Sequence, residues 1–354
     1  MGAGPVLGIE SSCDDTAAAV LDADGRVLAE AVLGQADHAA FGGVVPEIAA
    51  RAHLAVLPNL VARVMREAGL GFADLAAVAA SSGPGLIGGL IVGSGFAKGV
   101  AIARDLPFIA VNHLEAHALT MRLPGLLPGV APFPYLLLLS GGHSQCVAVQ
   151  GVGRHVRLGG TIDDAVGEAF DKAAKLLGLG WPGGPALESL ARHGDSARFA
   201  LPRPLLGRPG CDFSFSGLKT AVAQLVGKYP PGALPGQDAA DIAASFQLSV
   251  ADVVADRARN AMQAFLHANA PTRSSPLLVV AGGVAANQVL RNALQIAAGR
   301  DGFTFVAPPP RLCTDNAVMV AWAGLERLRC GLVDGIDHAP RPRWPLDDPD
   351  MVRP

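Results

Sequence analysis

Two segments of this chain repeat one layout, and this repeat constrains the fold more than any other feature. Residues 6–10, VLGIE, form an apolar run that ends in the polar loop SSCDDT and is followed by AAAVLDADGRVLAEAV. Residues 134–140, PYLLLLS, end in the loop GGHS and are followed by QCVAVQGVGRHVRLGG. Each layout predicts a buried strand, a tight loop and a hairpin.

A second correspondence follows deeper in each half. The segments LAAVAASSGPGLIGGLIVGSGFAKGVAIARDLPFIAV and PLLVVAGGVAANQVLRNALQIAAGRDGFTFVAP both predict a strand, a glycine loop, a helix and a strand. Between the halves, RLPGLLPGVAPFP is rich in proline and glycine and indicates a connector. The sequence therefore predicts an α/β fold with two duplicated lobes and a cleft. The alternative is that two common layouts coincide by chance.

Composition narrows the class of protein. With 50% hydrophobic and only 17% charged residues, the chain is expected to be globular rather than disordered. The net charge of −3 gives no overall attraction to a polyanion, so a nucleic acid would have to bind local basic patches or a partner. The five cysteines form no CxxC pair, which argues against a zinc ribbon or a disulfide framework.

The N-terminal sequence and a long uncharged segment indicate where in the cell the protein is located. The N-terminus has no signal-peptide pattern, so we predict a cytoplasmic protein. Residues 75–97 carry no charge and are long enough to span a bilayer, but glycines, serines and a proline interrupt them. We predict a buried strand, loop and helix there, and no association with a membrane.

The stretch NHLEAHALT suggests a metal site. On a helix, His113 and His117 stand four residues apart on one face and can reach one ion. Glu115 lies about 200° round the helix from either, so it cannot serve as the general base of an HExxH protease. A pair of helical histidines is otherwise often satisfied inside the core.

A third ligand would make the metal site more convincing. Asp315 follows a predicted strand and a proline-rich loop at the start of a helix, in CTDNAVM. Two histidines and one carboxylate leave coordination positions open, which suits zinc or ferrous iron. The alternative role for Asp315 is a helix N-cap.

Glycine loops at 82–85, 139–144, 181–188 and 281–287 indicate close backbone approach to a phosphate or ribose. None of them matches GxGxxG or the Walker A pattern. In the helix DDAVGEAFDKAAKLLGLG, Asp171 lies on the charged face and could accept hydrogen bonds from ribose hydroxyls. Its simpler interpretation is a solvated charge.

Taken together, GIESSCDDT, GGVVPEIAARAH, NHLEAH, LSGGHSQ, DDAVGEAFDKAAKLLGL, GGPALE, FSFSGLKTAV, AGGVAAN and CTDNAVM closely resemble the family of tRNA threonylcarbamoyladenosine transferases. The match runs from about residue 6 to 345. It implies an actin-like, sugar-kinase-like fold of ribonuclease H-like lobes around a nucleotide cleft. The expected N-terminal lobe is 1–125, joined by the helix region 314–345, the C-terminal lobe is 132–312, and 346–354 is a tail.

The resemblance also implies an activity and site residues. The family transfers the threonylcarbamoyl group from threonylcarbamoyl-adenylate to the exocyclic amine of adenosine 37 in tRNAs that read ANN codons, and releases AMP. The implied ligands of one divalent ion per subunit, Fe²⁺ or Zn²⁺, are His113, His117 and Asp315. The implied adenylate contacts are Leu138, Leu139, Ser140, Gly141, Gly142, Asp171, Gly184, Glu188 and Asn287.

Family members work with tRNA, a paralogous actin-like protein and a P-loop ATPase, and we expect the same partners here. The amine must lose a proton, and Asp14 or Asp15 is a candidate acceptor, unless this loop only shapes a phosphate site. The alternatives to this activity are a phosphotransferase with the same fold, such as a sugar kinase, and a non-catalytic scaffold in a tRNA-modifying complex. The geometry at Glu115 argues against a glycoprotease.

Overall fold

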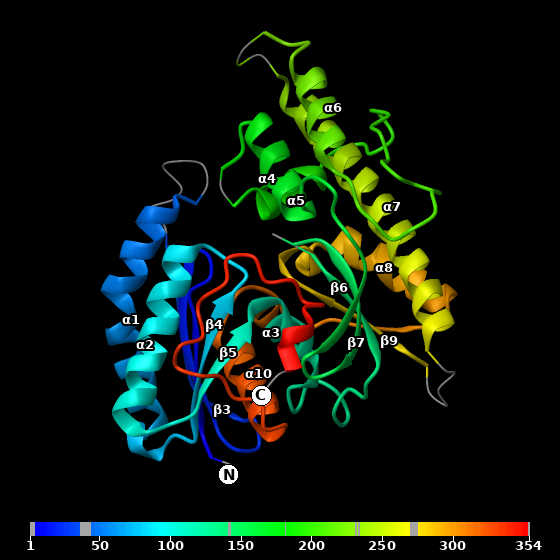
Figure 1. Cartoon of the computed structure of the whole chain (residues 1–354). Coiled ribbons are helices and arrows are strands. Elements are labelled where there is room, and N and C mark those ends of the chain that lie inside the picture. Colours follow the sequence, from blue (N-terminus) through cyan, green and yellow to red (C-terminus); the bar gives the residue numbers. More distant parts are fainter. Residues whose placement is uncertain are drawn as a thin grey trace. The chain divides into compact units, whose positions relative to one another are not determined.

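The computed structural model describes residues 4–35, 44–140, 143–180, 182–230, 232, 234–269 and 275–352. They form two compact units (Figure 1). Unit 1 comprises Met1–Phe133, Gln150–His155 and Thr314–Pro354, and unit 2 comprises Pro134–Val149 and Val156–Cys313. Each unit contains a mixed sheet covered by helices, so the predicted α/β class is confirmed.

The sheet of unit 1 has the strand order β3-β2-β1-β4-β5. Strands β1 and β2, and β2 and β3, pair antiparallel, whereas β1 with β4 and β4 with β5 pair parallel. The carboxyl ends of β1, β4 and β5 therefore meet at one edge. The bounds are Val6–Glu10 for β1, Asp15–Leu21 for β2, Val27–Gly34 for β3, Ala77–Gly83 for β4 and Phe108–Asn112 for β5.

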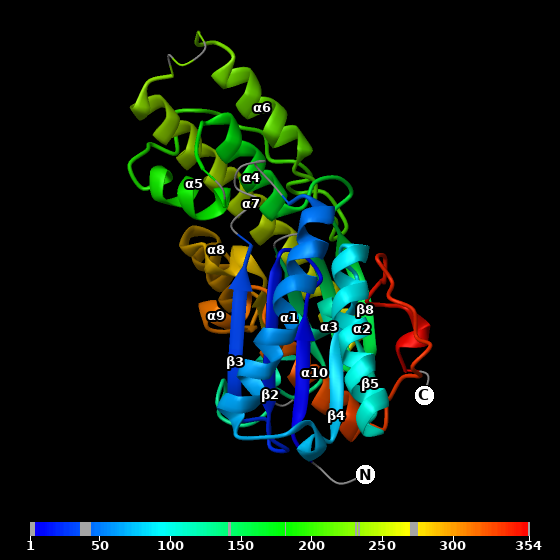
Figure 2. The ribbon, with the colours of Figure 1, turned by 90° about the vertical axis from the view of Figure 1, so that its left-hand side faces the viewer.

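Helices cover both faces of this sheet. Helices α1, Pro46–Ala68, and α2, Ile87–Arg104, pack against β2 and β4 (Figure 2). Helix α10, Ala317–Arg329, packs against β1, β2, β4 and β5. A Cβ on Gly8 would lie 2.4 Å from the backbone nitrogen of Ala321, so only glycine allows β1 to approach α10 this closely.

The sheet of unit 2 repeats the arrangement, with the order β10-β9-β6-β7-β8. Strand β6 pairs antiparallel with β7 and parallel with β9, and β9 pairs parallel with β10. The predicted duplication is thus confirmed by the strand order of the two sheets. The bounds are Tyr135–Leu139 for β6, Gln145–Gly151 for β7, Arg154–Gly160 for β8, Leu277–Ala281 for β9 and Thr304–Val306 for β10.

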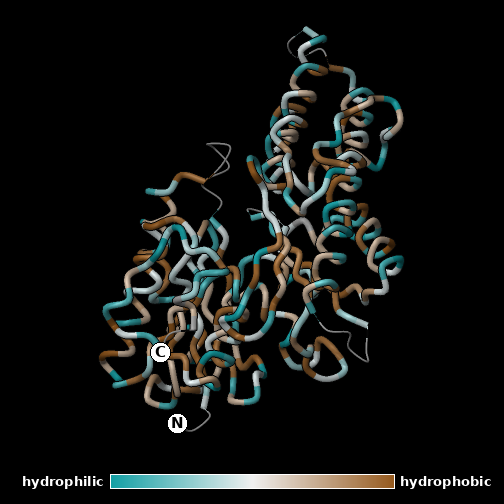
Figure 3. Tube along the Cα trace, turned by 45° about the vertical axis from the view of Figure 1, so that its right-hand side comes forward, coloured by the Kyte–Doolittle hydropathy of each residue, from teal (hydrophilic) through white to brown (hydrophobic). Residues whose placement is uncertain are grey.

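The remaining helices complete the units, and hydrophilic and hydrophobic residues alternate along many of them (Figure 3). In unit 1 these are α3, His113–Leu119, and the short 3₁₀ turns η2, Phe72–Asp74, η3, Thr120–Arg122, and η5, Pro349–Val352. In unit 2 they are α4, Val166–Leu176, α5, Gly183–Ala191, α6, Ser216–Val226, α7, Gly236–Ala268, η4, Gly283–Ala286, α8, Gln288–Arg300, and α9, Pro310–Cys313.

The uncharged segment 75–97 forms β4 and the first part of α2, as predicted. By length and composition, α1 and α2 are both apolar enough to cross a membrane. In the apolar 18-residue stretch of each helix, 39% of α1 and 33% of α2 is buried inside the protein. Core helices of globular proteins pass the same test, and both helices pack against the sheet of unit 1.

Candidate metal centre

Helix α3 starts directly at the carboxyl end of β5, because Asn112 caps it. The Asn112 side chain accepts hydrogen bonds from the backbone nitrogens of Leu114, at 2.9 Å, and Glu115, at 3.4 Å. Its amide group donates to the backbone oxygen of Trp344 at 3.0 Å. The C-terminal segment therefore fixes the side chain that begins α3, and with it the position of the first histidine.

The three predicted metal ligands lie together in unit 1. Nε2 of His117 lies 3.2 Å from Oδ1 of Asp315, and Nε2 of His113 lies 3.4 Å from the same oxygen. One ligand atom from each side chain lies within 4.8 Å of the others. Both histidines are buried, whereas the Asp315 side chain is 27% exposed. The donor set and its spacing fit one divalent ion with positions left open on the exposed side.

Asp315 is not the cap of α10. Asn316 takes that role, and its side chain accepts a hydrogen bond from the backbone nitrogen of Met319 at 2.9 Å. The alternative interpretation of Asp315 as the N-cap is therefore wrong. Because Asn316 supplies the cap, the carboxylate of Asp315 is left to face the two histidines.

The charges at the centre support one another. Burial disfavours the charged imidazolium of His113, but the carboxylates of Asp315 and Glu10 outweigh it and raise the pKa of His113 well above its ordinary value. Burial likewise opposes ionisation of Asp315, but His113 and His117 hold the pKa of that carboxyl well below its ordinary range. The carboxylates thus favour a positive charge between them, which a proton on His113 or a metal ion can supply.

Glu115 points away from the ligands, as predicted from the helix period. Its carboxylate accepts a hydrogen bond from the backbone nitrogen of Gly153 at 2.6 Å and forms an ion pair with Arg327 at 3.0 Å. The side chains of Glu115 and Arg327 are 0% and 2% exposed. Glu115 therefore fastens α3 to α10 and to the 150–155 segment and takes no part in a protease-like site.

The candidate proton acceptors lie at the end of the first loop, where Asp14 precedes β2 and Asp15 is its first residue. Burial, followed by the neighbouring carboxylates of Asp14, Asp315 and Glu10, raises the pKa of Asp15 to about 7. The loop is held by His53 of α1, which contacts the backbone oxygen of Cys13 at 3.0 Å through Nε2 and the Thr16 hydroxyl at 2.7 Å through Nδ1.

Two residues of this region, His53 and Glu10, were missed by the sequence reasoning. His53 belongs to GGVVPEIAARAH, a stretch that entered only as part of the resemblance. Glu10 is the last residue of the predicted strand 6–10. The available signal was its position, since a carboxylate at the carboxyl end of a buried strand must find donors or a cation.

The predicted adenylate contacts belong to unit 2. Leu138 and Leu139 lie in β6 with buried side chains, so only their backbone atoms could meet a ligand. The Ser140 hydroxyl donates to the backbone oxygen of Ala281 at 3.0 Å, at the joint ends of β6 and β9. Gly141 and Gly142 lie outside the described residues.

The other predicted contacts are linked by hydrogen bonds at helix starts. Asp171 of α4 accepts from the backbone nitrogen of Gly183 at 2.9 Å, next to Gly184. Glu188 of α5 accepts from the backbone nitrogen of Gln288 at 3.0 Å. The adjacent Asn287 caps α8 through the nitrogens of Val289 and Leu290. The structure thus brings α4, α5 and α8 together, and the helix-start nitrogens named here donate to side chains of the protein itself.

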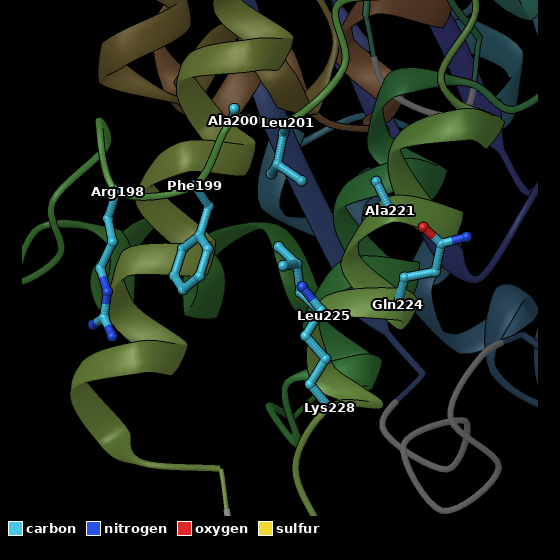
Figure 4. Close-up of a pocket in the computed structure, with 8 residues that line it drawn as sticks. All are labelled: Arg198, Phe199, Ala200, Leu201, Ala221, Gln224, Leu225 and Lys228. Atoms are coloured by element: carbon cyan, nitrogen blue, oxygen red, sulfur yellow. The ribbon is translucent and has the colours of Figure 1, made fainter.

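A surface cavity of about 250 Å³ lies elsewhere in unit 2 and includes none of the predicted site residues (Figure 4). Its one arginine is already neutralised, because Arg198 pairs with Asp238 and Asp241, each at 2.5 Å. The cavity is lined by Arg198, Phe199, Ala200, Leu201, Ala221, Gln224, Leu225 and Lys228.

Solved structures support the class of fold. Full-length HypF in its phosphate- and nucleotide-bound form has a TM-score of 0.56 and 14% identity, covering 92% of this chain and 46% of that one. HypF from T. kodakarensis gives a TM-score of 0.54 and 15% identity over 92% of this chain and 48% of that one. With the duplicated sheets and the His₂Asp cluster, the chain is an actin-like α/β protein with a candidate metal centre in unit 1.

Sequence comparisons identify the family. Residues 26–322 match the profile of TsaD, tRNA N6-adenosine threonylcarbamoyltransferase. Proteins of that name from Granulibacter bethesdensis and Gluconobacter oxydans are 68% and 62% identical, covering 99% and 97% of this chain and 96% and 94% of theirs. The chain belongs to the tRNA N6-adenosine threonylcarbamoyltransferase family and is an acyltransferase.

Proposed function

We propose that this protein transfers the threonylcarbamoyl group from threonylcarbamoyl-adenylate to N6 of adenosine 37 in tRNAs that read ANN codons. The amine nitrogen forms a bond to the carbonyl carbon, the bond from that carbon to the phosphate oxygen breaks, and AMP leaves. The nitrogen loses one proton to a base. The observation that carries the proposal is the His113, His117 and Asp315 cluster in a chain of this family.

The three ligands are proposed to hold one Fe²⁺ or Zn²⁺ ion. Such an ion, when bound, supplies Lewis-acid polarisation of a carbonyl oxygen. His113 and His117 lie on one face of α3 and present Nε2 toward Asp315, so the fold itself brings the three proposed donors together. Burial of both rings excludes water from that side of the centre.

Asp15 is the better candidate for the base, with Asp14 beside it. An exocyclic amine on an aromatic ring is a weak nucleophile, so proton removal during attack assists the reaction. A carboxyl whose pKa is about 7 is ionised in part at neutral pH and holds a proton far more readily than an ordinary aspartate. That property suits a proton acceptor in this reaction.

The direct test uses purified protein, unmodified tRNA and synthetic threonylcarbamoyl-adenylate, together with the partner proteins. Formation of threonylcarbamoyladenosine at position 37, with release of one AMP for each transfer, is the expected result. Phosphorylation of a sugar by ATP, without tRNA modification, would instead point to a phosphotransferase.

The pH dependence of stability tests the state of Asp15. Since folding raises its pKa to about 7 from an ordinary 3.8, its stabilising contribution is full at low pH and is lost as pH rises through about 7. Asp15→Asn should therefore stabilise the protein at pH 8 by about 1 to 2 kcal/mol and have little effect at pH 4. This energy is smaller than the full pKa shift would give, because Asp15 is partly exposed and solvent screens its charge.

The measurement is thermal unfolding at both pH values, with a chelator present, because a nearby cation would lower the same pKa. Asp24→Asn, in the β2–β3 turn, is the control for a general effect of charge. An Asp15→Asn effect that is equal at pH 4 and pH 8 would show that Asp15 titrates as an ordinary carboxyl.

Asp171 is proposed to bind the ribose of the adenylate. Asp171→Ala should weaken the affinity for a non-hydrolysable adenylate analogue by about 10- to 100-fold, since a hydrogen bond to a charged group contributes roughly 1.5 to 3 kcal/mol. Affinity for tRNA should change little. The measurement is calorimetry with each ligand, and Asp163→Ala, which disturbs the cap of α6, is the control for structural damage. Unchanged affinity for the analogue would reject the ribose role.

We further propose that the protein works in a complex with tRNA, a paralogous actin-like protein and a P-loop ATPase. The acidic net charge of −3 supports sharing of tRNA binding with other chains. Helices α1 and α2 expose Leu54, Ile87 and Ile91, at 65%, 46% and 55%, and are the surface that suits a helical partner.

A further inference from the structure

Glu10 is a buried carboxylate that is not among the three metal ligands. It ends β1 and is 0% exposed. Its Oε1 accepts a hydrogen bond from the backbone nitrogen of Ser12 at 2.6 Å, and its Oε2 accepts from the Ser81 hydroxyl. The same Oε2 lies 3.0 Å from Nδ1 of His113. A buried carboxylate in this setting needs several donors, and one of them is a metal-binding side chain.

The contact decides which nitrogen of His113 carries the proton. A neutral imidazole has one nitrogen that donates and one that accepts, and an ionised carboxylate can only accept. Nδ1 of His113 must therefore hold its proton against Glu10. With Nδ1 protonated, Nε2, which lies 3.4 Å from Oδ1 of Asp315, is the nitrogen that can give up its proton and bind an ion together with the other ligands. Metal-binding histidines are commonly oriented by a carboxylate in this manner.

His117 has no equivalent support. Its Nε2 faces Asp315, and its Nδ1 is buried with no hydrogen-bond partner among the residues that the structure describes. The Ser12 hydroxyl lies 3.2 Å from Nδ1 of His113 and adds to the support of that ring alone. The protein thus fixes the tautomer of one histidine ligand and leaves the other to be set by the ion.

We propose that Glu10 is a positioning residue of the metal centre, which holds His113 with its proton on Nδ1 and its Nε2 lone pair directed at the ion. The inference rests on the proposed metal centre. In this proposal Glu10 acts only through His113 and contacts neither the metal ion nor the threonylcarbamoyl-adenylate. Anchoring of the first loop alone, through Ser12 and Ser81, is the competing structural role.

The variant Glu10→Gln separates these two roles. If the glutamine oxygen keeps the bond from Ser12, its amide faces His113 and donates, so the ring must place its proton on Nε2, the atom that binds the ion. The affinity for Zn²⁺, measured by competition with a chromophoric chelator, should fall about 10- to 100-fold. Ser81→Ala removes another donor to the same carboxylate without changing the tautomer, and should keep its affinity within about twofold.

A second readout needs no variant. Nitrogen-15 NMR of the zinc-loaded wild-type protein should show Nδ1–H and a metal-bound Nε2 for His113. A metal-bound Nδ1 would overturn the inference even if Glu10→Gln failed to fold. Unchanged zinc affinity of folded Glu10→Gln, with wild-type NMR shifts, would overturn it as well and leave the metal centre intact. Failure of the wild type to bind zinc through His113, His117 and Asp315 would instead remove the centre itself, and Glu10 with it.

Discussion

Replacing Asp315 with alanine is expected to abolish threonylcarbamoyl transfer while the protein stays folded. Both histidine Nε2 atoms face Asp315, so its loss removes the one carboxylate of the proposed ligand set. Lewis-acid polarisation contributes several kcal/mol to transition states of this kind, which corresponds to a rate lower by about 10²- to 10⁴-fold. His113→Ala should have a similar effect. The measurement is single-turnover transfer to unmodified tRNA, with metal content determined on the same samples.

The control for these variants is His267→Ala, which removes an exposed histidine of α7 in unit 2. It should retain full activity and metal content. Far-UV circular dichroism and thermal unfolding establish that the ligand variants remain folded. Complete tRNA modification by a metal-free His113→Ala and Asp315→Ala double variant would refute the role of the centre.

The largest effect on stability is expected for Glu115→Gln. Removing one partner of a buried ion pair leaves the other charge without compensation, at a cost of about 3 to 5 kcal/mol. Glu115 and Arg327 form such a pair at 3.0 Å, and among the described residues the only other carboxylate within ion-pair distance of Arg327, that of Asp334, lies farther away at 4.0 Å. The variant should unfold at a markedly lower denaturant concentration. Chemical unfolding followed by circular dichroism gives the difference in unfolding free energy.

An exposed pair of the same chemistry provides the comparison. Glu47 and Arg51 form an ion pair on α1 at 2.7 Å, with side chains 77% and 79% exposed, and Glu47→Gln should cost no more than about 0.5 kcal/mol. At a temperature where Glu115→Gln remains folded, it should still bind one metal ion, because Glu115 faces away from the ligands. A loss of metal from the folded variant, with normal stability, would assign Glu115 to the metal site instead.

The topology was accessible from the sequence because it depends on local patterns. Apolar runs, glycine loops and helical periods recur in the same order in both halves, and each is a short-range signal. The period of an α-helix predicts that His113 and His117 lie on one face and that Glu115 lies on the opposite face. These features needed no knowledge of long-range contacts.

The contacts that hold helix α3 and its histidines in place could not be predicted from local patterns. The partner of Glu115 lies 212 positions away at Arg327, and the cap residue Asn112 is held by Trp344, 232 positions away. No local sequence pattern predicts contacts between residues so far apart in the chain. For the same reason the sequence predicts only a tail for 346–354, whereas in the structure Arg327 donates a hydrogen bond to the backbone oxygen of Met351. Long-range burial gives these residues their roles.

Unit 2 shows a different limit. Asn287 and Leu138 were selected through the resemblance, yet Asn287 caps α8 and Leu138 is buried in β6. A residue can both stabilise the fold and contact a ligand. A single sequence does not distinguish these two roles. The ligand role of these residues therefore stays a prediction.

The most direct test of the account is anomalous X-ray diffraction from crystals grown with Fe²⁺ or Zn²⁺. The account predicts one anomalous peak for each protein chain, about 2.0 to 2.2 Å from Nε2 of His113, Nε2 of His117 and a carboxylate oxygen of Asp315. A peak elsewhere, or no peak in protein that transfers threonylcarbamoyl at its full rate, would contradict it.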